Sequence, residues 1–385
     1  MQNRILHLHV QRHLAFGIYG LSRLINGTAT VWQEMHGNDS SNWSRFVHER
    51  WPFRWLGVSA FRGDFSMGEK GCDFWNRYKE DLGLAKNLGC TSFRFSFEWA
   101  RIEPSQGSYD EAAIQRFHDI LDTMEELGLE PNVTLHHFTH PTWFEDLGGF
   151  MKEENVPIFV EWAQFMFRTF HKRIKLWAIF NEPTAYTFLS FIVGLGPSPR
   201  YVSNIFNLIG AGRTLSNLLK AHTTTYWALK ALPGGKEASI GMVHHHIIWV
   251  TEWLSYWLGW DIMDHWMCTG EFEWRLPVFG TWIKWTDPGG KPPCDWWGIN
   301  FYSHPVAAWN LKPACLPHQI MTDMFYPIYP EGLYAAIQRS SRYGIPMYVT
   351  ETGIADHRND RRALLIETYF RVRSFIAMLL GQLKR

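Results

Sequence analysis

The sequence has no excess of charge of either sign, with 37 basic and 37 acidic side chains among its 385 residues. Nucleic-acid-binding proteins concentrate Lys and Arg to neutralise phosphates, so this balance gives no support for a nucleic-acid partner. A run of about 18 apolar residues, long enough to span a membrane, is also missing. Neither GxGxxG nor GxxxxGK[ST] occurs, so no nucleotide site is expected.

Cysteine is scarce and irregularly spaced. The five cysteines are odd in number and form no CxxC pair, so neither a zinc or redox site nor a disulfide framework is expected. Free thiols are typical of a reducing compartment. Residues 1–16 interrupt their apolar side chains with His, Gln and Arg, unlike the core of a secretory signal peptide. The sequence therefore predicts a cytoplasmic protein.

Aromatic residues, in contrast, are abundant. They make up 16% of the chain and include 21 tryptophans. A tryptophan ring can stack on the apolar face of a sugar, but it is also a large filler of protein cores. For any single tryptophan we expect a core position, whereas the excess as a whole favours a carbohydrate ligand.

Short apolar runs rich in β-branched and aromatic residues alternate with longer amphipathic segments. The expected strands are residues 92–97, 132–137, 176–181, 239–244, 297–302 and 346–351. The expected helices are residues 74–88, 111–127, 156–173, 215–232, 331–343 and 363–383. No linker or change of composition marks a domain boundary, so we treat residues 1–385 as one domain.

This alternation predicts a parallel sheet, either doubly wound or closed as a (β/α)8 barrel. Polar residues stand at the carboxyl end of strand after strand: His137, Asn181, Glu182, Tyr302 and Glu351. In a barrel all these ends meet at one mouth, whereas in a doubly wound sheet only the ends beside the switch point do. We therefore expect the TIM (β/α)8-type barrel.

Two of these residues, Glu182 and Glu351, are carboxylates at the ends of different strands. Glycoside hydrolysis uses such a pair. One carboxyl group is protonated and donates its proton to the leaving oxygen, and the other is ionised and attacks the anomeric carbon. A single Glu at a strand end is more often a solvated loop residue. The pair, with Pro183 directly after Glu182, is a stronger sign of glycosidase chemistry.

The chain resembles glycoside hydrolase family 1, the β-glucosidase-like enzymes, over residues 25–370. The motifs that carry the resemblance occur in family order: 78–81 (YKED), 93–102 (FRFSFEWARI), 134–138 (TLHHF), 180–183 (FNEP), 298–302 (GINFY) and 350–353 (TETG). The resemblance implies a retaining β-glycosidase that needs no cofactor and acts on a small β-glycoside or oligosaccharide. Glu182 would be the general acid/base and Glu351 the nucleophile.

The resemblance also implies supporting roles. His137 and Asn181 would bind sugar hydroxyls, while Arg94 and Tyr302 would contact Glu351 and hold it ionised, because a nearby cation lowers the pKa of a carboxylate. Tyr302 would also line the substrate site. With less cationic support, Glu182 would have a raised pKa and be protonated before attack.

Members of the resembled family bind the sugar with a Gln on the first strand. In this sequence that Gln has two candidate positions. Residues 27–33 resemble that segment with one residue missing and place Gln33 at the site, whereas residues 57–62 would place Arg62 there. The family-like residues that follow Gln33 favour the first alignment.

The chain departs from the family at its end. Only 34 residues (352–385) follow Glu351, and the family's terminal segment with its sugar-binding Glu and Trp is absent. We therefore expect a barrel that lacks its eighth strand, with strand edges left open. The end could be truncated or degenerate, or completed by an oligomer partner or another chain. The alternative function is a catalytically impaired family member that binds a sugar or a protein.

Two other readings stay open. Histidines cluster at 136, 137 and 140 and at 244–246, which allows a metal hydrolase, although no HExxH motif supports it. Alternating side chains put at most two histidines of each cluster on one face, so histidines packed in the barrel wall are the simpler interpretation. Transglycosylation, with an acceptor hydroxyl in place of water, would use the same residues as hydrolysis.

Overall fold

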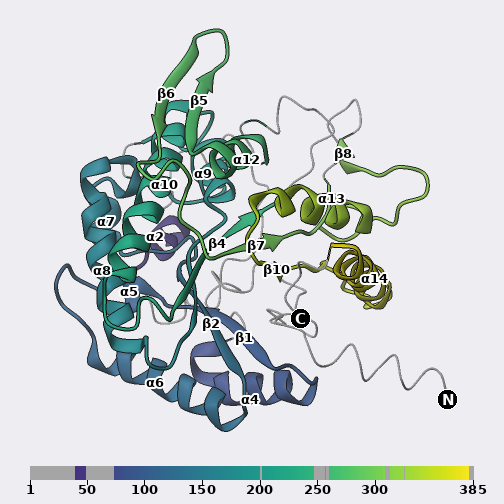
Figure 1. Ribbon diagram of the computed structural model, residues 1–385, viewed down its shortest axis with the longest axis horizontal. Helices are drawn as coiled ribbons and strands as arrows, with labels where there is room; N and C mark the ends of the chain where they lie inside the picture. The colour runs from purple at the N-terminus through teal and green to yellow at the C-terminus, as the bar shows by residue number, and fades with distance from the viewer. Residues whose placement is uncertain are drawn as a thin grey trace.

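The computed structural model describes residues 40–48, 73–199, 202–246, 256, 260–304, 306–307, 313–324 and 326–380. Its centre is one parallel sheet whose six strands follow each other in chain order (Figure 1). They are β1 (Ser92–Ser96), β2 (Glu130–His136), β3 (Leu176–Asn181), β4 (Ser239–His245), β7 (Trp296–Asn300) and β10 (Met347–Glu351). All six strands expected from the sequence are present, with closely similar ends.

The strands are apolar because both faces of the sheet are covered. β7 is buried at every position, and β3 at every position after its first. Parallel strands of this kind read as continuous apolar runs rather than as alternating patterns. Among the described residues, seven tryptophans are fully buried in the core, the position expected for a single tryptophan: Trp99, Trp162, Trp177, Trp266, Trp274, Trp296 and Trp297.

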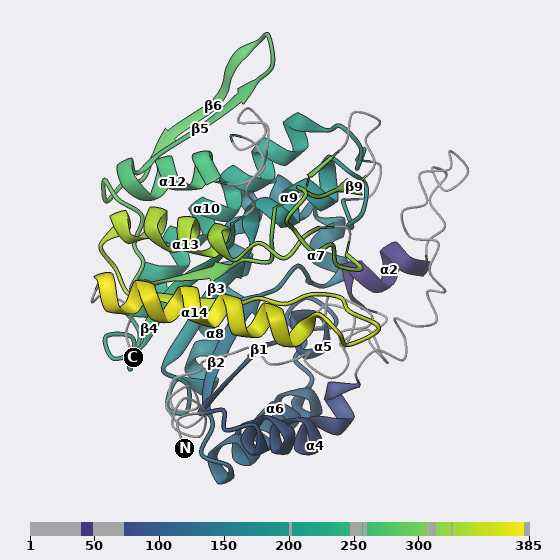
Figure 2. The same cartoon turned by 90° about the vertical axis from the view of Figure 1, so that its right-hand side faces the viewer.

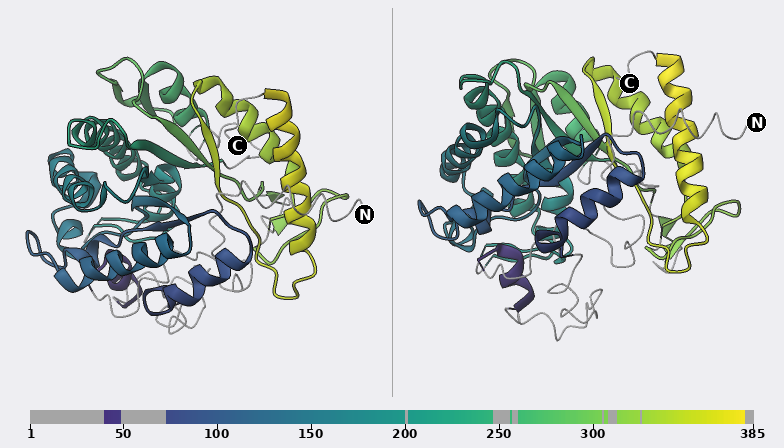
Figure 3. Two further views of the ribbon diagram at one scale, coloured as in Figure 1. Left: turned by 60° about the horizontal axis from the view of Figure 1, so that its bottom comes forward. Right: turned by 90° about the horizontal axis from the view of Figure 1, so that it is seen from below.

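Long helices lie around the strands (Figure 3). They are α4 (Phe74–Asn87), α6 (Glu111–Glu126), α8 (Val156–Phe170), α10 (Leu208–Lys230), α13 (Pro330–Ser340) and α14 (Arg362–Leu380). α6 shows why they form where the sequence predicts them. The Asp110 side chain accepts hydrogen bonds from the amides of Ala112 and Ala113 at its N-terminus. Its buried face carries Phe117 and Ile120. Figure 2 shows α13 and α14 lying side by side.

Shorter helices sit in the loops. They are α2 (Asn42–His48), α5 (Trp99–Ile102), α7 (Thr142–Asp146), α9 (Pro183–Phe191), α12 (Trp260–Thr269) and the 3-10 turns Gly149–Met151, Glu153–Asn155 and Ser341–Tyr343. In the parts of the chain that the structure describes, no helix combines the length and apolar character needed to cross a membrane.

The strand order decides between the two folds considered. A doubly wound sheet reverses direction at a switch point, whereas β1-β2-β3-β4-β7-β10 runs one way around. The fold is therefore an incomplete (β/α)8 barrel. Within the described ranges, β1 and β10 each pair with a single strand and form the two edges.

Two features were not expected from the sequence. β5 (Glu271–Leu276) and β6 (Gly280–Thr286) form an antiparallel hairpin that projects from the body (Figure 1). A second, two-residue ladder joins β8 (Val306–Ala307) and β9 (Pro313–Ala314).

The predicted start of α10, residue 215, is also wrong, because the helix begins at Leu208. Gly210 and Gly212 obscured the first turns, since glycine disfavours helix. A Cβ on Gly212 would lie 2.4 Å from the Trp274 ring, so packing against the hairpin requires a glycine there.

Candidate active site

The carboxyl ends of the strands bring the predicted site residues together at one end of the sheet. His245 on β4 pairs in register with Asn300 on β7, and Asn300 pairs with Glu351 on β10. Glu182 directly follows β3, and its backbone amide donates to the Val243 carbonyl of β4. Two carboxylates from well-separated parts of the sequence therefore share one mouth.

Glu351 is held by two strong donors. Arg94 Nη1 donates to its Oε1 at 2.5 Å, and the Tyr302 hydroxyl donates to its Oε2 at 2.5 Å. His137 Nε2 lies 4.0 Å from Oε1. Burial alone would raise the pKa of Glu351, but the Arg94 charge and the hydrogen bonds from Tyr302 and Arg94 outweigh it, so this pKa is lowered. Glu351 is therefore a carboxylate at neutral pH.

Arg94 reaches Glu351 from deeper in the sheet. It pairs in register with Asn132, on the part of β2 farther from the mouth, so only a long side chain can span the distance. Its Nη2 donates to Thr134 Oγ1 at 2.9 Å and to Asn181 Oδ1 at 2.8 Å. The guanidinium is thus oriented by three separate acceptors on three strands.

Glu182 has the opposite environment. Burial raises its pKa to about 8, and the negative charge of Glu351 adds to this effect, while the hydrogen bond from Asn300 and the Arg94 charge oppose it. Asn300 Nδ2 donates to Glu182 Oε1 at 2.6 Å. At neutral pH Glu182 is therefore mainly protonated beside an ionised Glu351.

The backbone at Glu182 is in an unusual conformation. Its φ of 45° and ψ of 62° lie in the left-handed region, which residues with a Cβ rarely adopt. The conformation is secured on both sides, because the Glu182 amide donates to Val243 and its carbonyl accepts from Tyr186 at 2.9 Å. Pro183 occupies the first turn of α9, where it needs no hydrogen-bond donor. Such conformations cluster at functional sites.

Asn300 is a central residue of this site. The sequence identified it only as part of the 298–302 (GINFY) motif. Its Oδ1 accepts from Thr350 Oγ1 at 2.6 Å, and its Nδ2 also donates to Asn181 Oδ1 at 3.2 Å. It thus links the loop carrying Glu182 to the strand carrying Glu351. Its place within an expected strand, residues 297–302, was visible in the sequence, but its partners were not.

Of the residues predicted to bind sugar, Asn181 and His137 lie at the mouth beside the two carboxyl groups, and their sugar-binding role stays a prediction. Asn181 Nδ2 is buried and has no hydrogen-bond partner among the described residues, a state that buried amides seldom keep without a ligand or water. His137 is buried beside Glu351, and burial lowers its pKa to about 4, so it is neutral at pH 7. Gln33 and its alternative Arg62 lie outside the described residues.

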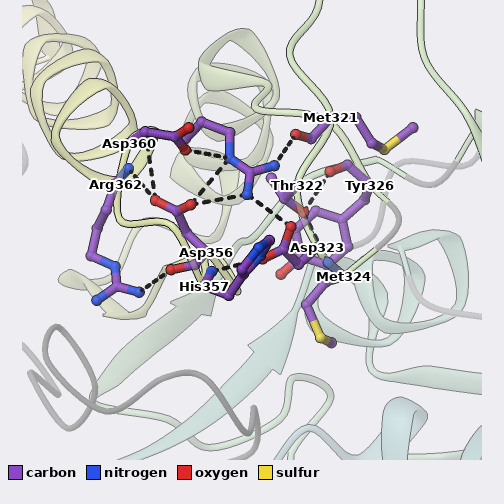
Figure 4. Close-up of polar contacts among 10 residues, drawn as sticks. Met321, Thr322, Asp323, Met324, Tyr326, Asp356, His357, Asp360 and Arg362 are labelled. Carbon is purple, nitrogen blue, oxygen red and sulfur yellow. Dashed lines mark hydrogen bonds and ion pairs between the residues drawn. The ribbon is translucent and has the colours of Figure 1, made fainter.

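The loop after Glu351 is anchored by ion pairs. Asp356 is buried, and Arg361 Nη2 lies 2.9 Å from its Oδ1 and 2.8 Å from Asp323 Oδ1. Figure 4 shows Asp356 and Asp323 turned toward the same guanidinium group. The hydroxyl of Tyr369 on α14 donates to the Tyr302 carbonyl at 2.7 Å. The ion pairs hold the loop after Glu351 to Asp323, and the Tyr369 hydrogen bond ties α14 to Tyr302.

The histidine clusters divide between the wall and the mouth: His137 and His245 lie beside the two carboxyl groups, whereas the other histidines pack within the wall. His136 Nε2 and His140 Nδ1 lie 3.1 Å apart, and His140 Nε2 lies 2.5 Å from Glu145 Oε2. Directly after β4, His246 Nε2 accepts a hydrogen bond from Trp297 Nε1 of β7 at 3.2 Å. Among the described residues, no group of three His, Cys, Asp or Glu side chains is arranged to hold a metal ion.

Comparison with known proteins finds β-glucosidases at low identity. The chain is 29% identical to Beta-glucosidase 20 of Arabidopsis thaliana over 285 residues, covering 65% of this chain and 52% of that protein. It is 29% identical to the Cytosolic beta-glucosidase of Homo sapiens over 212 residues, covering 54% of this chain and 42% of that protein. The chain spans about half the length of these curated relatives.

Solved structures show the same fold. A beta-glycosidase from Pyrococcus horikoshii superposes with a TM-score of 0.73 at 27% identity, over 90% of this chain and 79% of that one. A family 1 β-glucosidase from Thermotoga maritima gives a TM-score of 0.74 at 22% identity, over 90% of this chain and 82% of that one. The family model for glycosyl hydrolase family 1 matches residues 22–251, more than half of the sequence. The chain therefore belongs to glycosyl hydrolase family 1.

Proposed function

We propose that this chain is a retaining β-glycosidase of β-glucosidase type that cleaves O-glycosidic bonds by double displacement. One observation carries the proposal: the buried carboxyl group of Glu182 and the half-buried one of Glu351 share a mouth, and their surroundings shift their pKa values in opposite directions. Such a divided pair supplies an acid and a nucleophile at the same pH. The names of the relatives, β-glucosidases from a plant and from human, support the same substrate class.

In the first step Glu351 would attack the anomeric carbon while Glu182 gives its proton to the leaving oxygen. Arg94 and Tyr302 keep Glu351 ionised and aim its oxygens, since each oxygen accepts one of their hydrogen bonds. A covalent glycosyl ester on Glu351 results. In the second step Glu182, now a carboxylate, would take a proton from water, which releases the sugar with its configuration retained.

Sugar recognition would fall to polar groups around the two carboxyls. Asn181 Nδ2 is the clearest candidate donor, because it is buried without a partner among the described residues. His137 lies next to Glu351, where the ring hydroxyls of a bound sugar would lie. Tyr302 would line the same subsite, with Gln33 as the predicted contact from the first strand. The mechanism needs no cofactor.

The test is turnover of an aryl β-glucoside by the full chain, with Glu182→Gln and Glu351→Gln as matched controls. We expect wild-type turnover, with at least a ~10³-fold loss in Glu351→Gln and a large loss in Glu182→Gln. NMR of the first-formed sugar should show the β-anomer. We also expect a carboxyl separation of about 5–5.5 Å, whereas about 6.5–9.5 Å and an α-anomer would point to inversion.

The second candidate is a non-catalytic member that binds a sugar or a protein. The observation in its favour is the pair of sheet edges at β1 and β10, each with one strand partner within the described ranges. An oligomer or a partner chain covering those edges belongs to this candidate and is also compatible with the enzyme. If the wild type is as silent as both variants while a sugar still binds, the binding function replaces the enzymatic one.

A cytoplasmic location is part of the proposal. The four described cysteines, Cys90, Cys268, Cys294 and Cys315, are free thiols, as is typical of proteins in a reducing compartment. Fractionation of cells that express the chain tests this.

A further inference from the structure

We propose that His245 is a positioning residue for the water molecule that releases the sugar, a role that rests on the proposed glycosidase function. The water would sit between His245 Nδ1 and Glu182 Oε2. These atoms lie 3.8 Å apart. That is too long for a direct hydrogen bond, but one oxygen can lie ~2.8 Å from both.

The geometry identifies Oε2 as the reacting oxygen of Glu182. The other oxygen, Oε1, accepts the Asn300 amide at 2.6 Å. Since an amide nitrogen can only donate, the carboxyl proton belongs on Oε2. No hydrogen bond to Oε2 occurs among the described residues, so this oxygen is available to substrate and water. His245 is the side chain beside it.

The strand directs His245 into the mouth. Side chains alternate along a strand, and the neighbouring rings of His244 and His246 lie 4.8 Å apart, centre to centre, where both meet the buried Trp297 ring. The His245 ring meets the Tyr302 ring edge-on, with centroids 5.5 Å apart and planes at 88°. The side chain keeps 19% of its surface exposed, so water can reach it.

The charge state suits this role. Burial lowers the pKa of His245 to about 4, although the negative charge of Glu351 opposes the shift, so the ring is neutral at pH 7. The titratable groups facing the carboxyl–imidazole pair are Glu351 from β10 and Tyr302 from the loop after β7, with Arg94 from β1 acting on Glu182. A neutral imidazole protonated on Nε2 accepts a hydrogen bond at Nδ1.

The step balances without any further reactant. The water oxygen forms a bond to the anomeric carbon, and the ester bond from that carbon to Glu351 breaks. One water proton passes to Glu182 Oε2, and Glu351 leaves as a carboxylate. The second water hydrogen stays on the new sugar hydroxyl and donates to His245 Nδ1 throughout. His245 thus orients the nucleophile and gains no proton.

The experiment compares His245→Leu and His245→Asn with wild type, using the full chain and 2,4-dinitrophenyl β-glucoside. This leaving group departs so readily that the second step limits kcat. For His245→Leu we expect a fall of about tenfold in kcat, the size of one lost hydrogen bond, with kcat/KM nearly unchanged. Intact mass spectrometry should show more steady-state glycosyl-enzyme. Asparagine can still offer a polar atom near the Nδ1 position, so His245→Asn should recover most of kcat.

Azide provides a readout that a merely structural role would not move. It attacks without giving up a proton, so it should accelerate His245→Leu more than wild type and yield the glycosyl azide. Unchanged kcat in His245→Leu overturns the inference, as does an equal fall in kcat and kcat/KM that His245→Asn does not restore. A wild type that neither turns over the substrate nor forms an ester on Glu351 overturns the proposed function itself, and this inference with it.

Discussion

The side chain of Asn300 donates to Oε1 of Glu182 at 2.6 Å, from the strand next to the one that carries Glu351. The same side chain accepts from Thr350 at 2.6 Å, which fixes the amide with its nitrogen toward Glu182. One neutral residue therefore aligns the carboxyl group of Glu182 and joins it to the strand that carries Glu351. Because an amide does not ionise, it does so without disturbing the opposite charge states of the two carboxyls.

Replacing Asn300 should change both the rate and the pH dependence. In Asn300→Ala, Glu182 loses the hydrogen bond that lowers its pKa, so the alkaline limb of kcat/KM should move to higher pH. Loss of alignment should reduce kcat/KM by about 10²-fold. The measurement is a pH–rate profile with an aryl β-glucoside. Thr350→Val serves as the control, with a smaller loss and no alkaline shift, and an alkaline limb at lower pH in Asn300→Ala would contradict the assignment.

The wild-type kcat/KM should follow a bell-shaped pH profile. Glu182 must be protonated, and its pKa is raised to about 8, so activity should fall above about pH 8. Glu351 must be ionised, and its pKa is lowered from 4.5, so the acid limb should lie below that value. Rates measured from about pH 3 to about pH 10 check this, because that range brackets the pKa values of both groups. At each extreme, enzyme returned to neutral pH should regain its full rate, which separates titration from irreversible inactivation. A midpoint of the alkaline limb near pH 5 would be incompatible with the buried, charge-coupled Glu182.

Removal of the Arg94 charge should act on Glu351. In Arg94→Met the cation that lowers the pKa of Glu351 is gone, while burial still raises it, so the acid limb should move to higher pH. We expect kcat/KM to fall by about 10²–10³-fold. Arg94→Lys keeps the charge but lacks the planar fork of donors that reaches acceptors on three strands. Compared with Arg94→Met, it should show a smaller shift of the acid limb but most of the same loss in kcat/KM. Equal acid-limb shifts in the two variants would argue against the charge as the cause.

The anchor after Glu351 should contribute to stability in a pH-dependent way. Asp356 is buried, and although burial opposes it, hydrogen bonds from Arg361 and neighbouring amides lower its pKa from 3.8 to about 2. Its stabilisation is therefore complete above about pH 4 and lost as the pH falls through about 2.

Breaking the anchor by Arg361→Met leaves a buried carboxylate and should cost about 3–5 kcal/mol in the free energy of unfolding. Urea unfolding at pH 7 and pH 3 measures the effect. Asp356→Asn, the matched variant, should lose stability at pH 7 and show a weaker dependence on acid. A pH dependence equal to wild type in Asp356→Asn would rule out Asp356 as the titrating group.

Most of the sheet could be predicted because the signals are local. Each strand is a buried apolar run with a polar residue at its carboxyl end, and the alternation with amphipathic helices implies a parallel sheet whichever contacts form later. The β5–β6 hairpin and the first turns of α10 were not predicted from the sequence, because they stabilise each other through contacts between distant residues. Glycine at position 212 disfavours a helix by itself. The Trp274 ring packed against it is the reason that a glycine stands there.

The sequence by itself determined the chemistry available at the strand ends, because residue type and strand position are local properties. Glu182 and Glu351 could be named as a pair from their order, spacing and neighbours. Only the tertiary structure decided what each can do. Their pKa values depend on burial and on charges from other strands, and the free oxygen of Glu182 faces His245 because strand register places it there. Such distances between residues far apart in sequence exist only once the chain has folded.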